Sequence, residues 1–285
     1  MNYKQIEYLP PQVVQNLVDN FLLEDAPDGD ISSENIFDTQ DISTANISTR
    51  EDIILSGIAL FPFFFDNSFE IKSNFKDGDF VKKGEIIATI TGNTIKILKA
   101  ERIILNLMQR MSAISTLTNK YKKIVENYGV KILDTRKTTP GLRIFEKYAV
   151  VCGGGTNHRF DLSSGVMIKD NHISACGSVA KAVEKSRSSN HGKPIEVEID
   201  TFAQLREALD CEVDMLLLDN FSPENTIKAL SIIRSHKNGK DVFVESSGGI
   251  TLDTLEEYAK TKVDAISVGA LTHSAGSVDI GFDFV

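Results

Sequence analysis

Three segments of the sequence bring basic and hydroxyl side chains close together. The first, residues 134–143, reads Asp-Thr-Arg-Lys-Thr-Thr-Pro-Gly-Leu-Arg and places three cations among hydroxyls. An arginine guanidinium offers a planar fork that suits a carboxylate or a phosphate, and a lysine offers a compact charge. This segment could therefore bind a small anion. Composition alone equally allows a capped loop whose cations face water.

The other two segments are Gly153-Gly-Gly-Thr-Asn-His-Arg159 and Ile168-Lys-Asp-Asn-His172. Glycines allow a ligand to approach the backbone closely, although a glycine run can also be a mobile turn. Lys169 follows an apolar run, where a lysine usually extends toward solvent. At the mouth of a barrel it would instead face a ligand.

Charge is distributed unevenly along the chain. Residues 131–172 carry seven basic and four acidic side chains, a net charge of +3, whereas the whole chain has a net charge of −9. A basic segment in an acidic protein suggests a small anionic ligand. A solvated surface with accidental clustering is the alternative.

Two later segments, Glu245–Ile250 and Ser267–His273, are rich in small residues. In barrels, the loops after the last strands often hold a phosphate on backbone amides and a helix N-terminus. Either segment alone could be a tight turn chosen for packing. Together, at the last two expected strands, they favour phosphate binding.

The elements that must position these groups alternate from residue 130 onward. Helical patterns occur near 178–189, 201–210, 222–236 and 251–261, and short β-rich runs precede or separate them. Such alternation predicts parallel strands joined by right-handed crossovers. The expected strands are 131–134, 166–169, 195–198, 215–219, 242–245 and 265–269.

An open doubly wound sheet and a barrel both fit this alternation. Polar groups or glycine fall where each apolar run stops, and a barrel collects such strand ends around one mouth. We therefore expect a barrel with fewer than eight good strands. The groups at the strand ends are Asp134, Lys169, Glu198, Asp219, Glu245 and Gly269.

The N-terminal half has a different texture. An amphipathic helix follows Pro10-Pro11 and ends before Pro27. Strand-like pieces at 45–49, 53–60 and 86–90, with turn residues at 77–84, precede a long helical pattern from about 100 to 128. This half is expected to be a small α+β domain. The apolar run 61–65 is expected in the core or at a subunit interface.

Composition narrows the class of protein. The 285 residues are 41% hydrophobic and 25% charged, as in an ordinary globular protein, and no apolar run approaches the roughly 18 residues of a membrane span. The acidic net charge argues against a nucleic-acid partner. Three widely spaced cysteines and the lack of a secretory signal suit a reducing, cytoplasmic location. These cysteines are Cys152, Cys176 and Cys211.

In order along the chain, these segments resemble the quinolinate phosphoribosyltransferases, also called carboxylating nicotinate-nucleotide pyrophosphorylases. The most specific match is the combination of D-T-R-K-T-T-P-G-L-R with N-H-R and I-K-D-N-H. The resemblance covers nearly the whole chain. Further matching pieces are Glu24-Asp25, Gly29-Asp30, 78–84, 101–112, 146–150, 218–220, 247–249 and 269–275.

The resemblance implies an N-terminal α/β sandwich domain and a C-terminal open α/β barrel with about six or seven parallel strands. We expect the first domain over residues 1–115 and the barrel over 116–273, with the tail 274–285 returning to the first domain. Family members are dimers or larger homo-oligomers. Arg102 would then be donated across the interface to the site of the partner subunit.

The implied activity transfers the phosphoribosyl group of phosphoribosyl pyrophosphate to quinolinate with decarboxylation, which yields nicotinate mononucleotide for NAD biosynthesis. Lys137, Lys169, Glu198 and Asp219 would be catalytic, and magnesium would arrive with the pyrophosphate near Glu198 and Asp219, with no direct protein ligand expected. The residues implied to bind quinolinate are Arg102, Arg136, His158, Arg159 and Lys169. Those implied to cradle the 5′-phosphate are Ser247, Gly248, Gly249 and Gly269, and Thr135 joins the substrate-binding set.

Three alternatives compete with this interpretation. A nicotinate phosphoribosyltransferase without decarboxylation would need fewer cations than this chain offers. A non-catalytic sensor of a phosphorylated metabolite would tolerate the loss of Glu198 or Lys169. A biotinyl-type carrier is suggested only by the turn containing Gly78, Asp79 and Gly84, and its lysines lack distinctive flanks.

Overall fold

The computed structural model of the chain describes residues 3–189 and 192–285. These residues form two compact units. The first unit, called the parallel-sheet unit, contains residues up to 4 with 120–137 and 155–270. The second, called the antiparallel-sheet unit, contains 5–119, 138–154 and 271–285.

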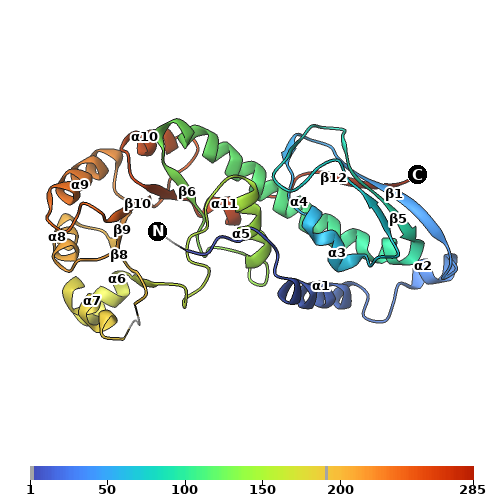
Figure 1. Ribbon diagram of the computed structural model, residues 1–285, viewed down its shortest axis with the longest axis horizontal. Helices are drawn as coiled ribbons and strands as arrows, with labels where there is room; N and C mark the ends of the chain where they lie inside the picture. Colours follow the sequence, from blue (N-terminus) through green and yellow to red (C-terminus); the bar gives the residue numbers. More distant parts are fainter. Residues whose placement is uncertain (1–2, 190–191) are drawn as a thin grey trace. The chain divides into compact units, whose positions relative to one another are not determined.

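A six-stranded parallel sheet forms the centre of the parallel-sheet unit (Figure 1). Its order is β6-β11-β10-β9-β8-β7, and every neighbouring pair is parallel. The predicted C-terminal fold of six or seven parallel strands is confirmed. In the described part of the chain β6 and β7 are the two edges, so the sheet is open. The strands are β6 (Lys131–Leu133), β7 (Val166–Ile168), β8 (Ile195–Ile199), β9 (Met215–Asp219), β10 (Phe243–Ser247) and β11 (Ala265–Ser267).

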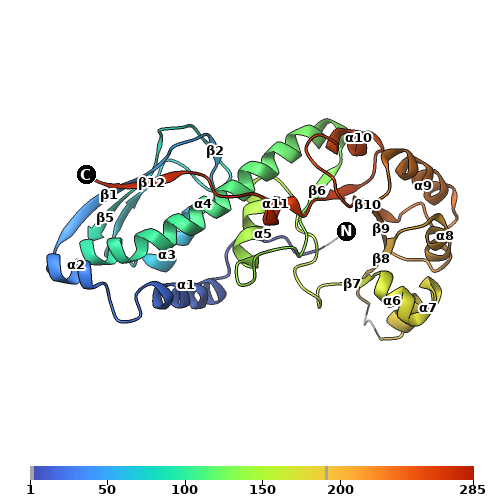
Figure 2. The same cartoon turned by 180° about the vertical axis from the view of Figure 1, so that it is seen from behind.

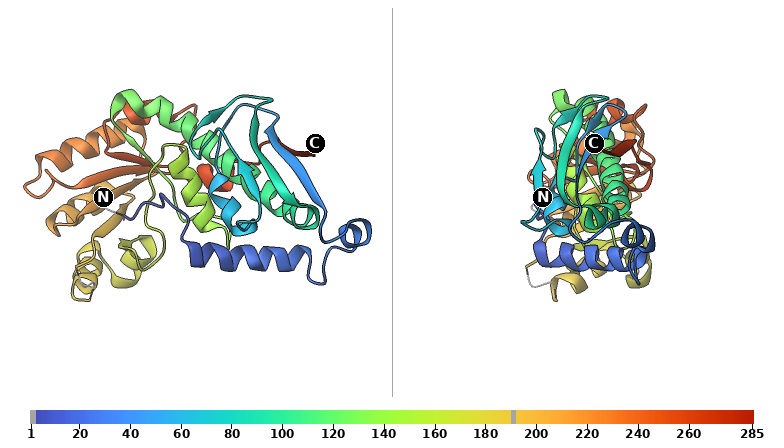
Figure 3. Two further views of the ribbon diagram at one scale, coloured as in Figure 1. Left: turned by 45° about the vertical axis from the view of Figure 1, so that its right-hand side comes forward. Right: turned by 90° about the vertical axis from the view of Figure 1, so that its right-hand side faces the viewer.

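Helices follow these strands and lie along the outer side of the sheet, as α8 and α9 show in Figures 1 and 3. Side chains of Ser178, Thr201 and Ser222 accept hydrogen bonds from N–H groups in the first turns of α7, α8 and α9. Such caps fix where each helix begins and so how each crossover leaves its strand. The helices are α6 (Asp170–Cys176), α7 (Val179–Arg187), α8 (Phe202–Asp210), α9 (Pro223–Ser235) and α10 (Leu255–Lys260).

The antiparallel-sheet unit contains a four-stranded sheet of order β12-β1-β5-β3. Its edge strand β12 (Ile280–Phe284) comes from the C-terminal end and pairs with β1 (Ile42–Thr49), as Figure 2 shows. On the other side of β1 lies β5 (Ile86–Asn93), followed by β3 (Glu70–Lys72). A separate pair joins β2 (Ile53–Ile54) to β4 (Phe80–Val81). The expected N-terminal α/β domain is thus confirmed.

Helices complete this unit and bury apolar side chains in its core. Val14 and Val18 of α1 (Pro11–Asp25) are fully buried, as are Ile97, Ile104 and Met108 of α4 (Thr94–Val125). Ser112 of α4 exchanges two hydrogen bonds with the backbone of Ser56. The remaining helices that contain residues of this unit are α2 (Ile31–Ile36), α3 (Phe61–Phe64), α5 (Arg143–Cys152) and α11 (Ala270–His273), and short 3₁₀ turns span Ile58–Leu60 and Glu126–Tyr128.

Some predicted boundaries were wrong. The strand expected over 53–60 ends at Ile54, because the N–H groups of Gly57 and Ile58 donate to the side chain of Asp77 instead of to a neighbouring strand. The long helix begins at Thr94 rather than near 100, since the side chain of Asn93 accepts from the N–H of Lys96. Helices α5 and α6 were not expected. Across the described residues, no helix combines the length and apolarity required to cross a membrane.

Candidate active site

One cavity of about 430 Å³ lies within the parallel-sheet unit, at the carboxyl ends of its strands. Because parallel strands all end at the same edge, residues far apart in sequence meet there. The lining combines four cations with several carboxylates, a composition typical of a site for a highly charged ligand. The lining residues are Asp134, Thr135, Arg136, Lys137, His158, Arg159, Met167, Lys169, Glu198, Leu217, Asp219, Glu245, Ser247 and Ser267.

The cations come from three loops. Arg136 and Lys137 follow β6, Arg159 precedes β7, and Lys169 follows β7 directly. Arg159 is buried, and its Nη1 atom donates to the carbonyl oxygen of Gly165 at 3.2 Å. Burial and the neighbouring charge of Arg136 lower the pKa of Arg159. Two guanidinium groups brought this close favour an anion between or beside them.

Glu198 and Asp219 supply carboxylates from the adjacent strands β8 and β9. Lys169 forms an ion pair with Glu198. Burial, then the charges of Glu198 and Asp200, raise the pKa of Asp219, while Lys169 and Lys137 act in the opposite direction. Hard carboxylate oxygens of this kind suit ribose hydroxyls or the water shell of magnesium.

The turn after β10 has a constrained backbone. Gly248 has φ of +101°, and a Cβ atom there would lie 2.2 Å from Oδ1 of Asn220. The N–H of Asn220 donates to the carbonyl oxygen of Ser247 at 2.8 Å, which ties the ends of β9 and β10 together. This arrangement admits no side chain at Gly248 without movement of Asn220.

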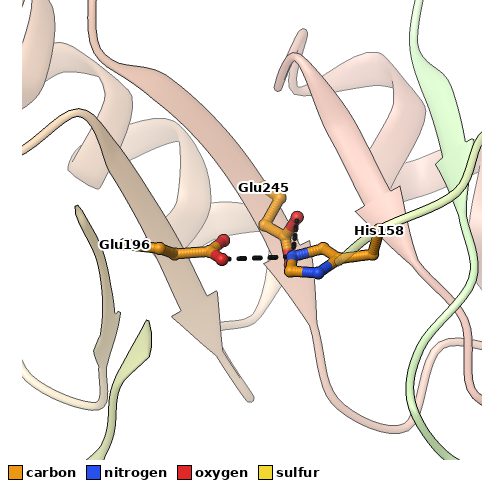
Figure 4. A group of neighbouring side chains, drawn as sticks. All are labelled: His158, Glu196 and Glu245. Atoms are coloured by element: carbon orange, nitrogen blue, oxygen red, sulfur yellow. Dashed lines mark ion pairs between the residues drawn. The ribbon is translucent and has the colours of Figure 1, made fainter. Parts of the chain in front are cut away.

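Below these groups lies a buried cluster of His158, Glu196 and Glu245 (Figure 4). Nε2 of His158 is 3.1 Å from Oε2 of Glu196 and 3.5 Å from Oε2 of Glu245. Burial lowers the pKa of His158, but the two neighbouring glutamate carboxylates outweigh it and raise that pKa to about 10. Burial and the charge of Glu245 raise the pKa of Glu196. Among the described residues, these three form the one His, Cys, Asp and Glu group arranged closely enough to hold a metal ion.

Asp134 organises the loop that carries His158. Its Oδ1 atom accepts the backbone N–H of His158 at 2.8 Å, and its Oδ2 atom accepts from Nδ2 of Asn157 at 2.6 Å. The backbone N–H of Arg159 points at Nδ1 of His158 at 2.7 Å. The Asn-His-Arg sequence is therefore held in place by a buried carboxylate at the end of β6.

Most of the predicted site residues meet at this cavity. Gly248 and Gly249 follow its lining residue Ser247, and Gly269 lies two residues after Ser267, but none of the three glycines lines it. Arg102 belongs to the antiparallel-sheet unit, where its side chain is 61% exposed. The predicted residues that line the cavity are Thr135, Arg136, Lys137, His158, Arg159, Lys169, Glu198, Asp219 and Ser247.

Sequence reasoning missed Glu196, which was not singled out at all. The run Ile-Glu-Val-Glu-Ile of β8 alternates, so Glu196 shares a face with Glu198, and this period of two could have revealed it. The same alternation pairs Glu245 with Ser247 on β10. Gly153 was read as a place for close ligand approach, but its Cα faces α4, where a Cβ atom would lie 2.4 Å from the carbonyl oxygen of Ser115.

Two family profiles match the chain and together span most of it. The profile described as "Quinolinate phosphoribosyl transferase, N-terminal domain" matches residues 30–112, and the corresponding C-terminal domain profile matches residues 114–283. The second profile contains every residue that lines the cavity.

Individual relatives agree with these profiles. The "probable nicotinate-nucleotide pyrophosphorylase (carboxylating)" of Bacillus subtilis is 43% identical over 95% of this chain and 93% of its own length. The nicotinate-nucleotide pyrophosphorylase (carboxylating) of Mycobacterium leprae is 38% identical over 89% of this chain and 90% of its own. The solved structure of the nicotinate-nucleotide pyrophosphorylase from Francisella tularensis superposes with a TM-score of 0.92 at 39% identity, and all of both chains is covered.

Proposed function

The chain belongs to the quinolinate phosphoribosyltransferase family, and we infer from this membership that it transfers the phosphoribosyl group of phosphoribosyl pyrophosphate to quinolinate and releases CO₂. The products are nicotinate mononucleotide, pyrophosphate and CO₂, so this pentosyltransferase serves NAD biosynthesis. The roles of individual residues are assigned from the charged lining of one cavity. Four cations and two strand-end carboxylates, Glu198 and Asp219, line one cavity of about 430 Å³.

We propose that the cations hold the two adjacent carboxylates of quinolinate. These groups repel each other, and removing them from water is costly unless several positive charges face them. Arg136, Arg159 and Lys169 line the cavity together with His158, which supports this assignment. Lys137, the most exposed of the four cations, is proposed to lie near the pyrophosphate or the reacting carbon.

Glu198 and Asp219 are proposed to contact the ribose hydroxyls of phosphoribosyl pyrophosphate. Magnesium would arrive with the pyrophosphate near these two carboxylates and neutralise the leaving charge, with no protein ligand assigned to it directly. The segment from Ser247 to Gly249 is proposed to hold the 5′-phosphate on backbone amides, with Gly269 beside it. The strained turn at Gly248 supports this placement because it leaves the amides uncovered by a side chain.

The first stage exchanges bonds at C1′ of the ribose. The bond from C1′ to the pyrophosphate oxygen breaks, and the pyridine nitrogen supplies the electron pair of the new bond to C1′. Positive charge develops on the ribose during this exchange, and the carboxylates of Glu198 and Asp219 stabilise it electrostatically. The residues contribute mainly placement and charge, so no side chain is required as a covalent nucleophile.

The second stage removes CO₂ from C2 of the pyridine ring. The nitrogen is now quaternary, so the electron pair of the breaking carbon–carboxylate bond remains at C2 next to a positive centre. A proton then replaces the carboxylate at C2. Cations that grip the departing carboxylate too tightly would oppose this step, and we infer that the pocket cations differ in how firmly they hold the two carboxylates.

Three finer features belong to the same proposal. The protein is proposed to form a homodimer or a larger homo-oligomer, in which Arg102 of one subunit completes the site of its partner. The high exposure of the Arg102 side chain supports this role. A cytoplasmic location is proposed because both substrates are metabolites of a biosynthetic route.

The deciding experiment incubates the purified protein with quinolinate, phosphoribosyl pyrophosphate and magnesium, with nicotinate in a parallel reaction. Mononucleotide and CO₂ are measured together. Equal amounts of both from quinolinate, and neither from nicotinate, are expected. Mononucleotide from nicotinate would instead favour the transferase that does not decarboxylate. Tight binding of both ligands without turnover would favour a metabolite sensor.

A further inference from the structure

Glu196 and Glu245 take part in neither of the two proposed reaction stages, although both are fully buried in the parallel-sheet unit. Ionised carboxylates near a site for a dicarboxylate would repel it, so their presence requires an explanation. Glu245 itself lines the cavity, whereas Glu196 is not among the lining residues. Both carboxylates face the side chain of His158.

Both glutamates converge on one nitrogen of His158, as the dashed lines in Figure 4 show. Glu196 reaches it from β8 and Glu245 from β10, and the strand between them, β9, contributes no titratable group to the contact. Ser267 of β11 donates to the other oxygen of Glu245 at 2.8 Å. The carboxylate of Glu245 is thereby held by a hydrogen bond at Oε1, while its Oε2 atom faces His158 at 3.5 Å.

The opposite side of the imidazole ring is equally constrained. Its Nδ1 atom faces the backbone N–H of Arg159 at 2.7 Å, which places a proton on Nε2, the nitrogen that faces the carboxylates. The ring of Tyr3 packs 5.0 Å away, centroid to centroid, and the backbone N–H of His158 donates to Asp134. Together, these described contacts fix the orientation of the ring.

We propose that Glu196 and Glu245 are positioning residues that act on quinolinate through His158. They face Nε2 from 3.1 Å and 3.5 Å and hold the imidazole in the floor of the cavity, in the orientation in which Nδ1 faces the backbone N–H of Arg159. The backbone N–H of Arg159 contacts the same ring, so the ring also fixes the position from which the Arg159 side chain extends toward the cavity. This inference rests on the proposed binding of quinolinate at Arg136, Arg159 and Lys169.

The test compares Glu196→Gln and Glu245→Gln with the wild type. Each change keeps the size of the side chain but removes its charge. Affinities for quinolinate and for phosphoribosyl pyrophosphate are measured separately by calorimetry. We expect quinolinate affinity to fall roughly tenfold in each variant, the effect of losing one charged hydrogen bond, with little change for phosphoribosyl pyrophosphate. A merely structural role would weaken both affinities together.

Two further measurements link the effect to the imidazole. The ¹⁵N chemical shift of Nε2 in His158, assigned by its loss in His158→Asn, should move in both variants. In the His158→Asn background, Glu196→Gln should change quinolinate affinity little further, because the route through the ring is already gone. Glu207→Gln, a glutamate of α8 that bonds only the N–H of Ala180 among the described contacts, is the matched control.

Unchanged quinolinate affinity in both glutamine variants would overturn the inference. So would equal losses for the two substrates, or a full effect of Glu196→Gln in the absence of His158. A stoichiometric metal ion found in the wild-type protein and lost in both variants would replace it with a metal site. If the wild type binds no quinolinate at all, the proposed function itself fails, and the two failures are thereby distinguished.

Discussion

Lys169 and Glu198 form an ion pair at the carboxyl ends of β7 and β8, and both line the cavity. The register of the parallel pair explains the contact, because Ile168 is paired with Val197 and the next residues therefore meet. Before any ligand binds, the carboxylate of Glu198 compensates the charge of Lys169. A bound dicarboxylate must therefore compete with Glu198 for this ammonium group.

The first prediction concerns Lys169→Ala. Removal of the ammonium group should lower kcat/KM for quinolinate roughly 10- to 100-fold, since a hydrogen bond between charged groups is lost and Glu198 remains uncompensated. Steady-state kinetics with each substrate varied in turn measure this. Lys228→Ala is the control, because Lys228 pairs with Glu224 on the exposed surface of α9 and should leave kcat/KM unchanged. If kcat/KM of Lys169→Ala equals that of the wild type, Lys169 does not contribute to quinolinate binding.

The second prediction compares two adjacent glycines. Gly248→Ala should weaken phosphoribosyl pyrophosphate binding at least tenfold, because its Cβ atom would lie 2.2 Å from Oδ1 and 2.8 Å from the backbone nitrogen of Asn220. Gly249→Ala meets nothing within 4 Å, and only its φ of +62° opposes it, at a cost of roughly 1 kcal/mol. Calorimetric titration and urea unfolding of both variants separate binding from stability. Equal effects of the two changes would contradict the steric argument.

The third prediction uses the pH dependence of stability. The pKa of His158 is about 10 in the folded chain, above its usual value near 6.5, because the nearby carboxylates of Glu196 and Glu245 outweigh the effect of burial. The stability gained from this group is complete below pH 6.5 and is lost as pH rises through 10. The free energy of unfolding of the wild type should therefore fall between pH 7 and 9.5 more steeply than that of His158→Asn.

Parallel pH profiles of the two proteins would indicate a different state of His158. The ring would then be neutral at pH 7, with Nδ1 accepting the backbone N–H of Arg159, as the 2.7 Å separation permits. In both states Nε2 carries a proton toward the carboxylates. Urea unfolding at several pH values, followed by circular dichroism, distinguishes them.

Strand ends were predictable from the sequence because apolar runs stop where a polar group must face the cavity. Lys169 and Asp219 were placed correctly for this reason. Glu245 was placed at a strand end but lies in the middle of β10, since the polar Ser246 and Ser247 continue the strand. A serine can occupy a strand position as readily as an apolar residue, so the change from apolar to polar residues does not mark the end of β10.

Other parts of the site required three-dimensional information. Nothing in the spacing of His158, Glu196 and Glu245 indicates that they meet, because β8 and β10 become next-nearest strands only through the fold. Helix α5 was missed although its charged residues Arg143, Glu146 and Lys147 recur at helical spacing, and only the fold shows that Glu146 and Lys147 are buried. Contacts between non-adjacent strands, by contrast, leave no periodic signal in the sequence.

The last prediction tests whether Arg102 acts across a subunit interface. Arg102→Ala and Lys169→Ala subunits, each expected to be strongly impaired by itself, are mixed under conditions that allow exchange. In a mixed dimer, one site combines an intact Lys169 with an intact Arg102 of the partner, whereas the other site lacks both. Random exchange makes half of the dimers mixed, so about a quarter of the wild-type activity should return.

The mixture distinguishes donation of Arg102 to the partner's site from use of Arg102 in the site of its own subunit. If Arg102 served the site of its own subunit, every site in a mixed dimer would lack either Arg102 or Lys169, and no activity would return. A mixture of Arg102→Ala with the double variant Arg102→Ala/Lys169→Ala must remain inactive, because it offers no intact Arg102. Exchange itself is verified by mass spectrometry of subunits labelled with heavy isotopes. Proven exchange without recovered activity would therefore reject donation of Arg102 across the interface, and it would leave this exposed side chain without a place in the site.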